Sequence, residues 1–449
     1  MKKTVLTLAV AAVVFQMPFH AQAAGFQLAE YSATGLGRAF AGEAAMADNA
    51  AAQSRNPAML NYLAGRQLSA GAIYVMPNID VTGDIAISSP LLGSEVIHIP
   101  ASAHDVAGDA PVPNFYYSNQ LNDQWTWGLA VNSNYGLATE IESTHAAAIF
   151  GNSTAVTTVE FNPNIAYRVN EQFTLGAGLR VVYGEGEIGA SAPYWIEGIK
   201  AIPTLPDAIK AQLPSAGTSL KSMEGDDISM GWKAGASWQI NKDHRLGLAY
   251  HSGVKLDLDG KASGLVYVGP EGGHIDGYLP LELPAFAELA SYHQLTENWA
   301  MHASVNWTQW SVFDQLVAYF PNEKPSNGED FDVVKEENFK DNWRYAVGTT
   351  YSINHDWLLR AGVALDQTAV NDKDRTTTIP DTNRLWFSVG AGYQATEKLT
   401  VDFALTYIKM SGDAPINETQ NLLNLAQINF NGDATGDVWL AGVQFSYKM

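Results

Sequence analysis

The stretch "WAMHASVNW", residues 299–307, contains a histidine and a serine that together suggest hydrolytic chemistry. A histidine next to a serine hydroxyl can activate it as a nucleophile, provided that a third group orients the histidine. Apolar and polar residues alternate along the stretch, which places His302 and Ser304 on one face of a strand, in its middle. No third group is placed to orient the histidine, so the pair does not predict an enzyme.

Two loop segments are rich in carboxylates, "NDKD" at 371–374 and "NGEDFD" at 327–332. Such clusters can bind Ca²⁺, but neither segment has the complete ligand spacing of a calcium loop, so we expect solvated loops and no metal site. The chain has 0 cysteines, which excludes disulfide and thiol chemistry. It contains no G-x-x-x-x-G-K-[ST] loop for a nucleotide, and we expect no cofactor.

The composition narrows the class of protein. The formal net charge of −21 argues against a nucleic-acid partner, because a phosphate-binding surface needs an excess of lysine and arginine. Only 16% of the residues are charged, 11% are aromatic and 39 are glycine, which favours a membrane barrel. No Pro- or Ser-rich linker divides the chain, so we expect one structural unit.

The first residues have the pattern of a secretory signal peptide. Two lysines precede an apolar run at 5–15, and "AQA" at 21–23 has the small residues of a cleavage site. We therefore predict that residues 1–23 are removed and that the mature chain begins at Ala24. No stretch reaches the roughly 18 apolar residues that a membrane helix needs. The exported chain is then either soluble or a β-barrel.

Alternation with a period of two residues recurs throughout the chain after residue 66. In "MGWKAGASW", residues 230–238, the tryptophans share one face and Lys233 lies on the other. A membrane barrel requires this arrangement, because lipid contacts the apolar face and a polar lumen contacts the other. A soluble β-sandwich would alternate as well, but it would turn its polar face outward and would not need a rhythm of short and long connections.

Short polar turns such as "RVNEQ" and "INKDH" alternate with long segments, as in outer-membrane barrels. The sequence thus predicts an all-β fold, a 14-stranded antiparallel transmembrane β-barrel, in which the strand number is even. The expected strands lie near 68–77, 112–119, 125–136, 154–169, 173–189, 227–240, 244–259, 277–293, 299–316, 339–352, 357–367, 383–393, 399–409 and 438–449. The expected long loops are 78–111, 190–226, 260–276, 318–338, 368–382 and 410–437.

Residues 24–65 do not alternate, and we expect them to fill the lumen, because a barrel of this width leaves a hole otherwise. "EAAMADNAAAQS", residues 43–54, is alanine-rich and predicts a helix, which should end at Asn56 because Pro57 follows. Charges of this segment could pair with charges that alternation points inward from the wall, and we expect such pairs rather than contacts with substrate. The former are Glu30, Arg38, Glu43, Asp48 and Arg55; the latter are Glu160, Arg168, Arg180, Lys233, Arg344, Arg360, Asp366, Arg384 and Asp402.

The mature N-terminus, "AGFQLAEYSATGLGRAFAGEAAMADNAAAQSRNPAML", resembles that of the FadL family of outer-membrane long-chain fatty-acid transporters. The triplet Asn56-Pro57-Ala58 and the run "SNYGLATE" at 133–140 match the family's most recognisable motifs, and the similarity covers essentially the whole mature chain. The resemblance implies a barrel at 66–449 plugged by an N-terminal hatch at 24–65. It also implies passive passage of hydrophobic molecules across the outer membrane of a Gram-negative bacterium.

The expected loop at 190–226 is apolar enough to capture such a molecule beyond the lipopolysaccharide. In "TLPDAIKAQL", Leu205 and Ile209 fall on one helical face, and "APYWIEGIKAI" adds Tyr194 and Trp195. So apolar a loop is either a lid packed on its neighbours or a capture groove. The family resemblance favours capture, with the substrate held between this loop and the loop at 260–276.

The resemblance further places Ile188, Met223 and Lys335 in a tighter site inside the barrel, with Lys335 contacting the carboxylate of the substrate. Strict alternation from the strand that follows would point Lys335 outward, so its stretch must leave the regular register or belong to a loop. The family's second basic residue, expected near position 190, is Ala190 here. Recognition of the head group is then weaker or moved to another lysine, or the ligand is not an acid. The candidate lysines are Lys200, Lys210 and Lys221.

Release is expected at Asn134-Tyr135-Gly136, where the family match implies that the third strand kinks inward, as glycine allows, and opens a lateral gap. The alternative is that Gly136 only ends the strand. Movement of the hatch after binding would connect the site with the gap, and without a nucleotide-binding loop the transport must run downhill.

Two other functions stay open from the sequence. One is a channel for other hydrophobic compounds, such as aromatic hydrocarbons, and the other is a general porin, which would need neither an apolar extracellular helix nor a filled lumen. We expect a monomer in contact with outer-membrane lipid and lipopolysaccharide. The sequence ends in "FSYKM", with Tyr447 two residues before Met449, whereas barrels of this kind usually end in an aromatic residue.

Overall fold

The structure is a computed structural model that describes residues 25–90, 96–326, 328–422 and 426–449. The predicted signal peptide at 1–23, Ala24 and the first residue of the acidic segment 327–332 lie outside the described residues. Within the described ranges, the helices are all too short or too polar to cross a bilayer.

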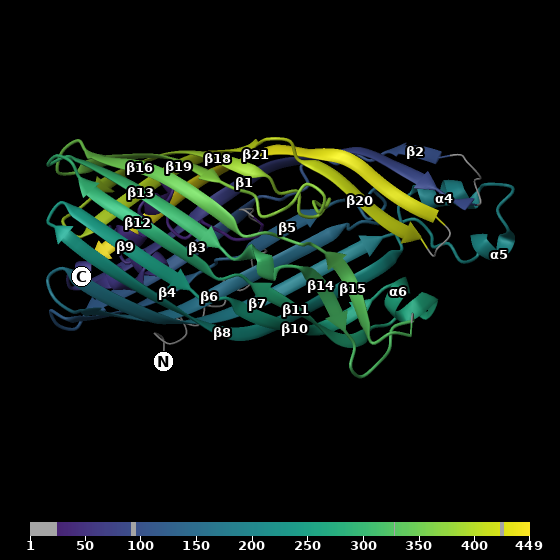
Figure 1. Ribbon diagram of the computed structural model, residues 1–449, viewed down its shortest axis with the longest axis horizontal. Helices are drawn as coiled ribbons and strands as arrows, with labels where there is room; N and C mark the ends of the chain where they lie inside the picture. The colour runs from purple at the N-terminus through teal and green to yellow at the C-terminus, as the bar shows by residue number, and fades with distance from the viewer. Residues whose placement is uncertain (1–24, 91–95, 327, 423–425) are drawn as a thin grey trace.

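The chain folds into one closed antiparallel barrel of 14 wall strands, as the sequence predicts. β1 (Arg66–Ser88) pairs with β21 (Ala426–Lys448) from Gln67↔Lys448 to Ser88↔Gln427, which closes the barrel. The C-terminus lies toward one end of the barrel, and the helices α4, α5 and α6 lie toward the other (Figure 1). Closure removes the free strand edges that an open sheet would expose.

Half of the wall strands are interrupted and count as two segments each, so that the wall contains 21 segments. Besides β1 and β21, the uninterrupted strands are β6 (Ser153–Arg168), β7 (Phe173–Ser191), β8 (Ser219–Asn241), β17 (Trp357–Asp366) and β18 (Asn383–Gln394). The interrupted strands are β2 (Val96–Pro100) with β3 (Ala110–Gln120), β4 (Trp125–Asn132) with β5 (Gly136–Glu140), β9 (His244–His251) with β10 (Val254–Ser263), β11 (Ile275–Leu283) with β12 (Phe286–Gln294), β13 (Trp299–Thr308) with β14 (Gln315–Tyr319), β15 (Phe331–Glu336) with β16 (Asn342–Ser352), and β19 (Leu399–Ser411) with β20 (Pro415–Leu422).

The alternation seen in the sequence separates the two faces of the wall. On β8, Met230 and Trp232 are 73% and 52% exposed, whereas Lys233 next to them is 1% exposed. Lipid therefore contacts the apolar residues, and the polar ones point into the barrel.

The predicted bounds of two long loops, 78–111 and 410–437, are wrong, because part of each predicted loop is strand in the structure. β1 continues to Ser88 and β21 already begins at Ala426, and the two pair along this extension. Polar and glycine residues in "NIDVTGDIAIS", residues 78–88, resemble a loop, but Ile79, Val81, Ile85 and Ile87 between them keep the period of two and are buried. The expected loops at 190–226 and 318–338 likewise contain the start of β8 and all of β15.

Residues 25–65, here called the plug segment, lie inside the ring of strands (Figure 1). Its elements are α2 (Ala33–Leu36), η1 (Glu43–Ala45), α3 (Ala52–Arg55) and η2 (Pro57–Tyr62). α2 contacts β1, β18, β19 and β21, whereas η2 contacts β4, β6, β7 and β8. Because these contacts reach opposite parts of the wall, the segment crosses the lumen.

The helix expected at 43–54 is wrong, because this stretch contains only the short elements η1 and the start of α3. The alanines allow close packing instead. A Cβ at Gly247 of the wall would lie 1.9 Å from the Ala44 carbonyl oxygen, so the plug backbone rests directly on the strand. Asn56 fixes the next turn, because its side chain donates to the Ala44 carbonyl at 2.6 Å and accepts from the Ala58 amide at 2.9 Å. α3 ends before Asn56, as predicted.

We expect Gly362→Ala to weaken the packing of the plug segment, because the added Cβ would lie 2.1 Å from the Arg38 carbonyl oxygen. Overpacking of this kind costs about 1–3 kcal/mol. Thermal unfolding of the purified protein in detergent should show a lower midpoint for this variant. Ala361→Val, which adds volume on the exposed outer face one residue earlier, should keep the wild-type midpoint. Equal midpoints for the two variants would contradict the close contact.

Candidate functional site

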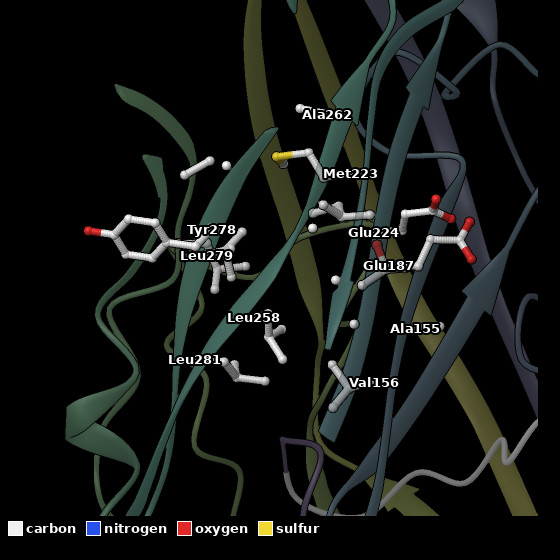
Figure 2. A pocket seen from close by; sticks show the side chains of 18 of the residues that line it. Ala155, Val156, Glu187, Met223, Glu224, Leu258, Ala262, Tyr278, Leu279 and Leu281 are labelled. Carbon is white, nitrogen blue, oxygen red and sulfur yellow. The ribbon is translucent and has the colours of Figure 1, made fainter. Parts of the chain in front are cut away.

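An apolar cavity, here called the inner cavity, lies between the plug segment and the wall. Its volume is about 70 Å³. Figure 2 shows Leu258, Leu281 and Val156 converging on this space, while the carboxylate of Glu224 points away. Further residues that line it are Phe26, Leu137, Ile188, Phe313 and Ile379. Such a lining suits a hydrocarbon and offers few polar groups.

A larger cavity, here called the outer cavity, lies toward the extracellular loops and has a volume of about 390 Å³. Pro214 and Leu265 line it, so that the two loops expected to hold substrate do meet there. Ile188 and Met223, which the resemblance placed inside the barrel, line both cavities and pair directly across β7 and β8. This residue pair therefore forms the boundary between the outer and the inner cavity.

Lys335 lines the outer cavity from β15. β15 pairs Val333 with Val317 but Lys335 with Leu316, so an extra residue bulges the strand here, and Lys335 leaves the alternation that Phe331, Val333 and Trp343 keep and lies inside. Its Nζ is 3.1 Å from Glu418 Oε1 and donates to Thr378 Oγ1 at 2.6 Å. The ammonium is therefore already paired within the protein.

Lys221 is the second cation of the outer cavity, which Ala190 also lines. Its Nζ lies 2.7 Å from Asp332 Oδ2, which also accepts from the Tyr267 hydroxyl at 2.7 Å. Burial and the neighbouring Asp332 raise the pKa of Tyr267 well above its usual value, so its hydroxyl remains a donor. The other candidate lysines, Lys200 and Lys210, form ion pairs within their own helices, α4 (Trp195–Lys200) and α5 (Asp207–Lys210).

Leu205 and Ile209 line a third cavity of about 80 Å³, here called the loop cavity. The opposite side is formed by Ile87 and Leu422, so Leu205 and Ile209 of the loop at 190–226 do not face the loop at 260–276, which meets the loop at 190–226 at the outer cavity instead. The reason is the extension of β1 and β21, whose far ends reach the side of the barrel where α4 and α5 lie (Figure 1), so that Ile87 and Ala426 line this cavity.

The other two residues expected to capture substrate do not line the inner, outer or loop cavity. Trp195 is 5% exposed, and its indole N–H donates to the Ala146 carbonyl oxygen at 3.0 Å. Tyr194 is exposed to solvent. Trp195 therefore packs the loop onto the barrel, as in the lid interpretation.

The third wall strand is broken between β4 and β5. Asn132 pairs with Glu160 and Gly136 with Thr157, so the broken strand contains one residue more than β6 does over the same interval. β4 pairs with β3 as far as Val131↔Phe115, whereas among the described pairings β5 has only β6 as a neighbour. We call the unpaired interval between β3 and β5 the ladder gap.

Gly136 is not among the glycines with positive φ, so a left-handed backbone does not explain why glycine suits this position. The constraint is space, since a Cβ there would lie 3.1 Å from Leu28 Cδ1. The neighbouring side chains hold the break in place. Asn134 Nδ2 donates to Glu160 Oε2 at 2.8 Å, and the Tyr135 hydroxyl donates to the Pro284 carbonyl at 2.6 Å.

The start of the plug segment lies against the broken strand. The Leu28 amide donates to the Asn134 carbonyl and the Gly136 amide to the Phe26 carbonyl, both at 2.8 Å. These bonds make Gln27 and Tyr135 an antiparallel bridge. Because Phe26 also lines the inner cavity, residues 26–28 separate that cavity from the ladder gap.

An aromatic cluster surrounds Phe26, and sequence reasoning missed it. The Phe26 ring lies 4.6 Å from that of Trp310, 5.2 Å from Phe313 and 6.1 Å from Tyr135 between centroids. Trp310 and Phe313 come from the interruption between β13 and β14, where η5 (Trp310–Val312) replaces the strand. The signal was present in "WTQWSVF", residues 307–313, where the alternation fails.

The residues that suggested other chemistry have structural partners. His302 is buried, with Nε2 2.9 Å from Thr350 Oγ1, and the described hydrogen bonds do not join it to Ser304. In the acidic segments, Asp372 pairs with Arg375 at 3.0 Å and Asp332 with Lys221. Among the described residues, no group of histidine, aspartate and glutamate side chains could hold a metal ion.

Most of the inward-pointing charges of the plug segment pair with other plug residues, and most of those of the wall pair with other wall residues. Arg38 of the plug segment lies 2.8 Å from Asp48, and Arg180 of the wall lies 2.8 Å from Glu160. The plug joins the wall through Arg55 and Glu288, 2.8 Å apart, and through Asp48 and Arg360, 4.0 Å apart; of these residues only Glu288 was not among the expected charges. These pairs fix the plug and the wall.

A closed membrane barrel with apolar internal cavities defines an outer-membrane transport protein. The family model described as "Outer membrane protein transport protein (OMPP1/FadL/TodX)" matches residues 14–449, and the chain belongs to this family. The family and the outer-membrane location predicted from the sequence are thereby confirmed.

Known relatives cover most of the chain. The long-chain fatty acid transport protein of Escherichia coli O6:H1 is 36% identical over 463 residues, which cover 99% of this chain and 98% of that protein. Outer membrane protein P1 of Haemophilus influenzae is 37% identical over 404 residues, with 87% and 86% covered. The crystal structure of a Pseudomonas aeruginosa FadL homologue has a TM-score of 0.79 at 22% identity and covers 95% of this chain and 100% of its own, which shows the shared fold.

Proposed function

We propose that this protein carries long-chain fatty acids passively across the outer membrane and releases them sideways through the wall. The observation that supports this most is the line of apolar space through the barrel. The outer cavity meets the inner cavity at Ile188 and Met223, and the inner cavity ends at Phe26 and Leu137, next to the broken strand. The long-chain fatty acid transport protein named above is related over nearly its whole length, which supports the substrate class.

Capture would begin at the loop cavity, where Leu205 and Ile209 offer apolar surface, and continue into the outer cavity beside Lys335. The substrate would then pass the boundary at Ile188 and Met223. Each step replaces water by apolar side chains, so the hydrocarbon chain is drawn inward without an energy source.

Exit would require residues 26–28 of the plug segment to leave the broken strand. Among the described residues, two backbone hydrogen bonds join Leu28 and Gly136 to their partners there, so few hydrogen bonds must break, although Phe26 must also leave its aromatic cluster. The plug segment would then act as a hatch, with Asn56-Pro57-Ala58 as the part that stays anchored.

A second candidate is the passage of neutral hydrophobic compounds, such as aromatic hydrocarbons. The inner cavity is lined almost entirely by apolar groups, and both cations of the outer cavity are paired. The toluene transporter TodX of Pseudomonas putida has a related fold, with a TM-score of 0.61 at 19% identity. That likeness concerns the fold alone, so the support for this second function comes from the apolar lining of the inner cavity.

Cells that lack their own long-chain fatty-acid uptake should regain growth on oleate when they produce this protein. The expected reason is that oleate can enter the apolar cavities and leave below the lipopolysaccharide. The measurement is growth together with uptake of labelled oleate, compared with cells that carry an empty vector. A gain of permeability to small sugars without oleate uptake would favour a porin and contradict the proposed function.

A further inference from the structure

We infer that Glu418 is a built-in counter-ion of Lys335 that competes with the carboxylate of an acidic substrate, so that the outer cavity favours neutral amphiphiles over carboxylates. This inference rests on the proposed function and sharpens its substrate class. Nothing in the sequence around β20 suggested that a carboxylate from this segment reaches Lys335.

The ion pair is held by consecutive threonines of one loop. Glu418 Oε2 accepts from the amide and from the hydroxyl of Thr377, each at 3.0 Å. Thr378, the next residue, accepts from Lys335 Nζ at 2.6 Å. Because one loop positions both partners, the 3.1 Å contact between Lys335 and Glu418 belongs to a fixed arrangement rather than to an occasional encounter of mobile side chains.

The pair is also shielded from water. The side chains of Lys335 and Glu418 are each 9% exposed, so water screens their attraction little. A substrate carboxylate that approached Lys335 would have to displace Glu418 or share the ammonium with it. Either outcome leaves one buried carboxylate without full compensation, which is costly.

The second cation offers no alternative. Of the described residues that line the outer cavity, Lys221 and Lys335 are the two cations, and Lys221 is held by Asp332 at 2.7 Å. A neutral head group, such as a hydroxyl, can instead enter beside both pairs and hydrogen-bond without breaking either.

Glu418→Gln tests the inference, because the amide keeps the size of the side chain and an acceptor for Thr377 but removes the charge. We would measure the affinities of the purified protein for oleate and for oleyl alcohol, which share the hydrocarbon chain. The ratio of oleate affinity to alcohol affinity should rise roughly tenfold, equivalent to about 1.4 kcal/mol. The gain should vanish in the double variant Glu418→Gln/Lys335→Ala, because the freed ammonium is then absent.

Glu224→Gln is the matched control, since it removes a carboxylate that points away from the inner cavity (Figure 2) and does not line the outer cavity, so it should leave the ratio as in the wild type. The unmodified protein provides a second measurement, in which oleyl alcohol should bind at least as tightly as oleate. An unchanged ratio in Glu418→Gln, or a clear preference of the wild type for oleate, would overturn the inference while leaving the proposed function intact. Binding of neither ligand by the wild type would overturn both.

Discussion

Deletion of Tyr135 should reduce oleate uptake to the level of cells without the protein, while the purified variant still binds oleate. The third wall strand contains one residue more than β6 between Asn132↔Glu160 and Gly136↔Thr157. Removing one residue from this interval restores equal lengths. The strand can then run straight, and β5 can pair with the free edge of β3.

The deletion also preserves the faces of the strand. Asn132 and Leu137 both point inward, next to Glu160 and Val156, and losing one residue between them changes their odd separation to an even one, equal to that of Glu160 and Val156, as residues on one face of a regular strand require. No charge is moved to the lipid face, so the barrel should still assemble. Lys335 and Met223 belong to other strands, which is why binding should persist.

Tyr135→Ala is the control for this deletion. It removes the same ring and the same hydroxyl bond to Pro284 but keeps the extra residue, so the ladder gap should remain and uptake should continue. Uptake is measured in cells with matched amounts of folded protein in the outer membrane. Normal uptake by the deletion variant would mean that substrate continues down the lumen, and the lateral exit would be wrong.

The wall could be predicted from the sequence because lipid on one face and a polar interior on the other impose an alternation that short turns punctuate. Met230, Trp232 and Lys233 show it within four residues. The alternation also continues beyond the expected strand end in β1, where Ile79 and Val81 are buried between polar residues, although the polar residues there resemble a loop. The plug segment followed from the width of the barrel, but its local structure did not, because contacts such as Ala44 on Gly247 outweigh the helix propensity of alanine.

The polar part of the site could not be predicted, because barrel closure brings together segments that are distant in the sequence. Glu418 reaches Lys335 across 83 positions, and the threonines that hold both lie on a third segment. Alternation gives the direction of a side chain within a strand, but it says nothing of partners across an interruption. At the two interruptions, around Trp310 and around Tyr135, strand hydrogen bonding stops. The first contributes side chains to the aromatic cluster around Phe26, and the second leaves the ladder gap.

A disulfide between positions 27 and 135 should make uptake depend on a reductant. Gln27 and Tyr135 form an antiparallel bridge flanked by hydrogen bonds of their neighbours, so they are a non-hydrogen-bonded pair. Cα atoms of such pairs lie about 4.5 Å apart, within the usual range of about 4.4–6.8 Å for disulfides. The chain has 0 cysteines of its own, so Gln27→Cys/Tyr135→Cys can form only this bond within the molecule.

The cross-link fixes the start of the plug segment to the broken strand. If residues 26–28 must move aside before substrate can leave the inner cavity, oxidised cells should take up oleate only at background level. Reduction should restore uptake to the level of the two single-cysteine variants, which share the lost side chains but cannot form the bond. Oleate binding to the oxidised protein should persist, because the outer cavity lies on the far side of Ile188 and Met223. Undiminished uptake by protein shown by mass spectrometry to be fully cross-linked would mean that substrate leaves without moving this contact.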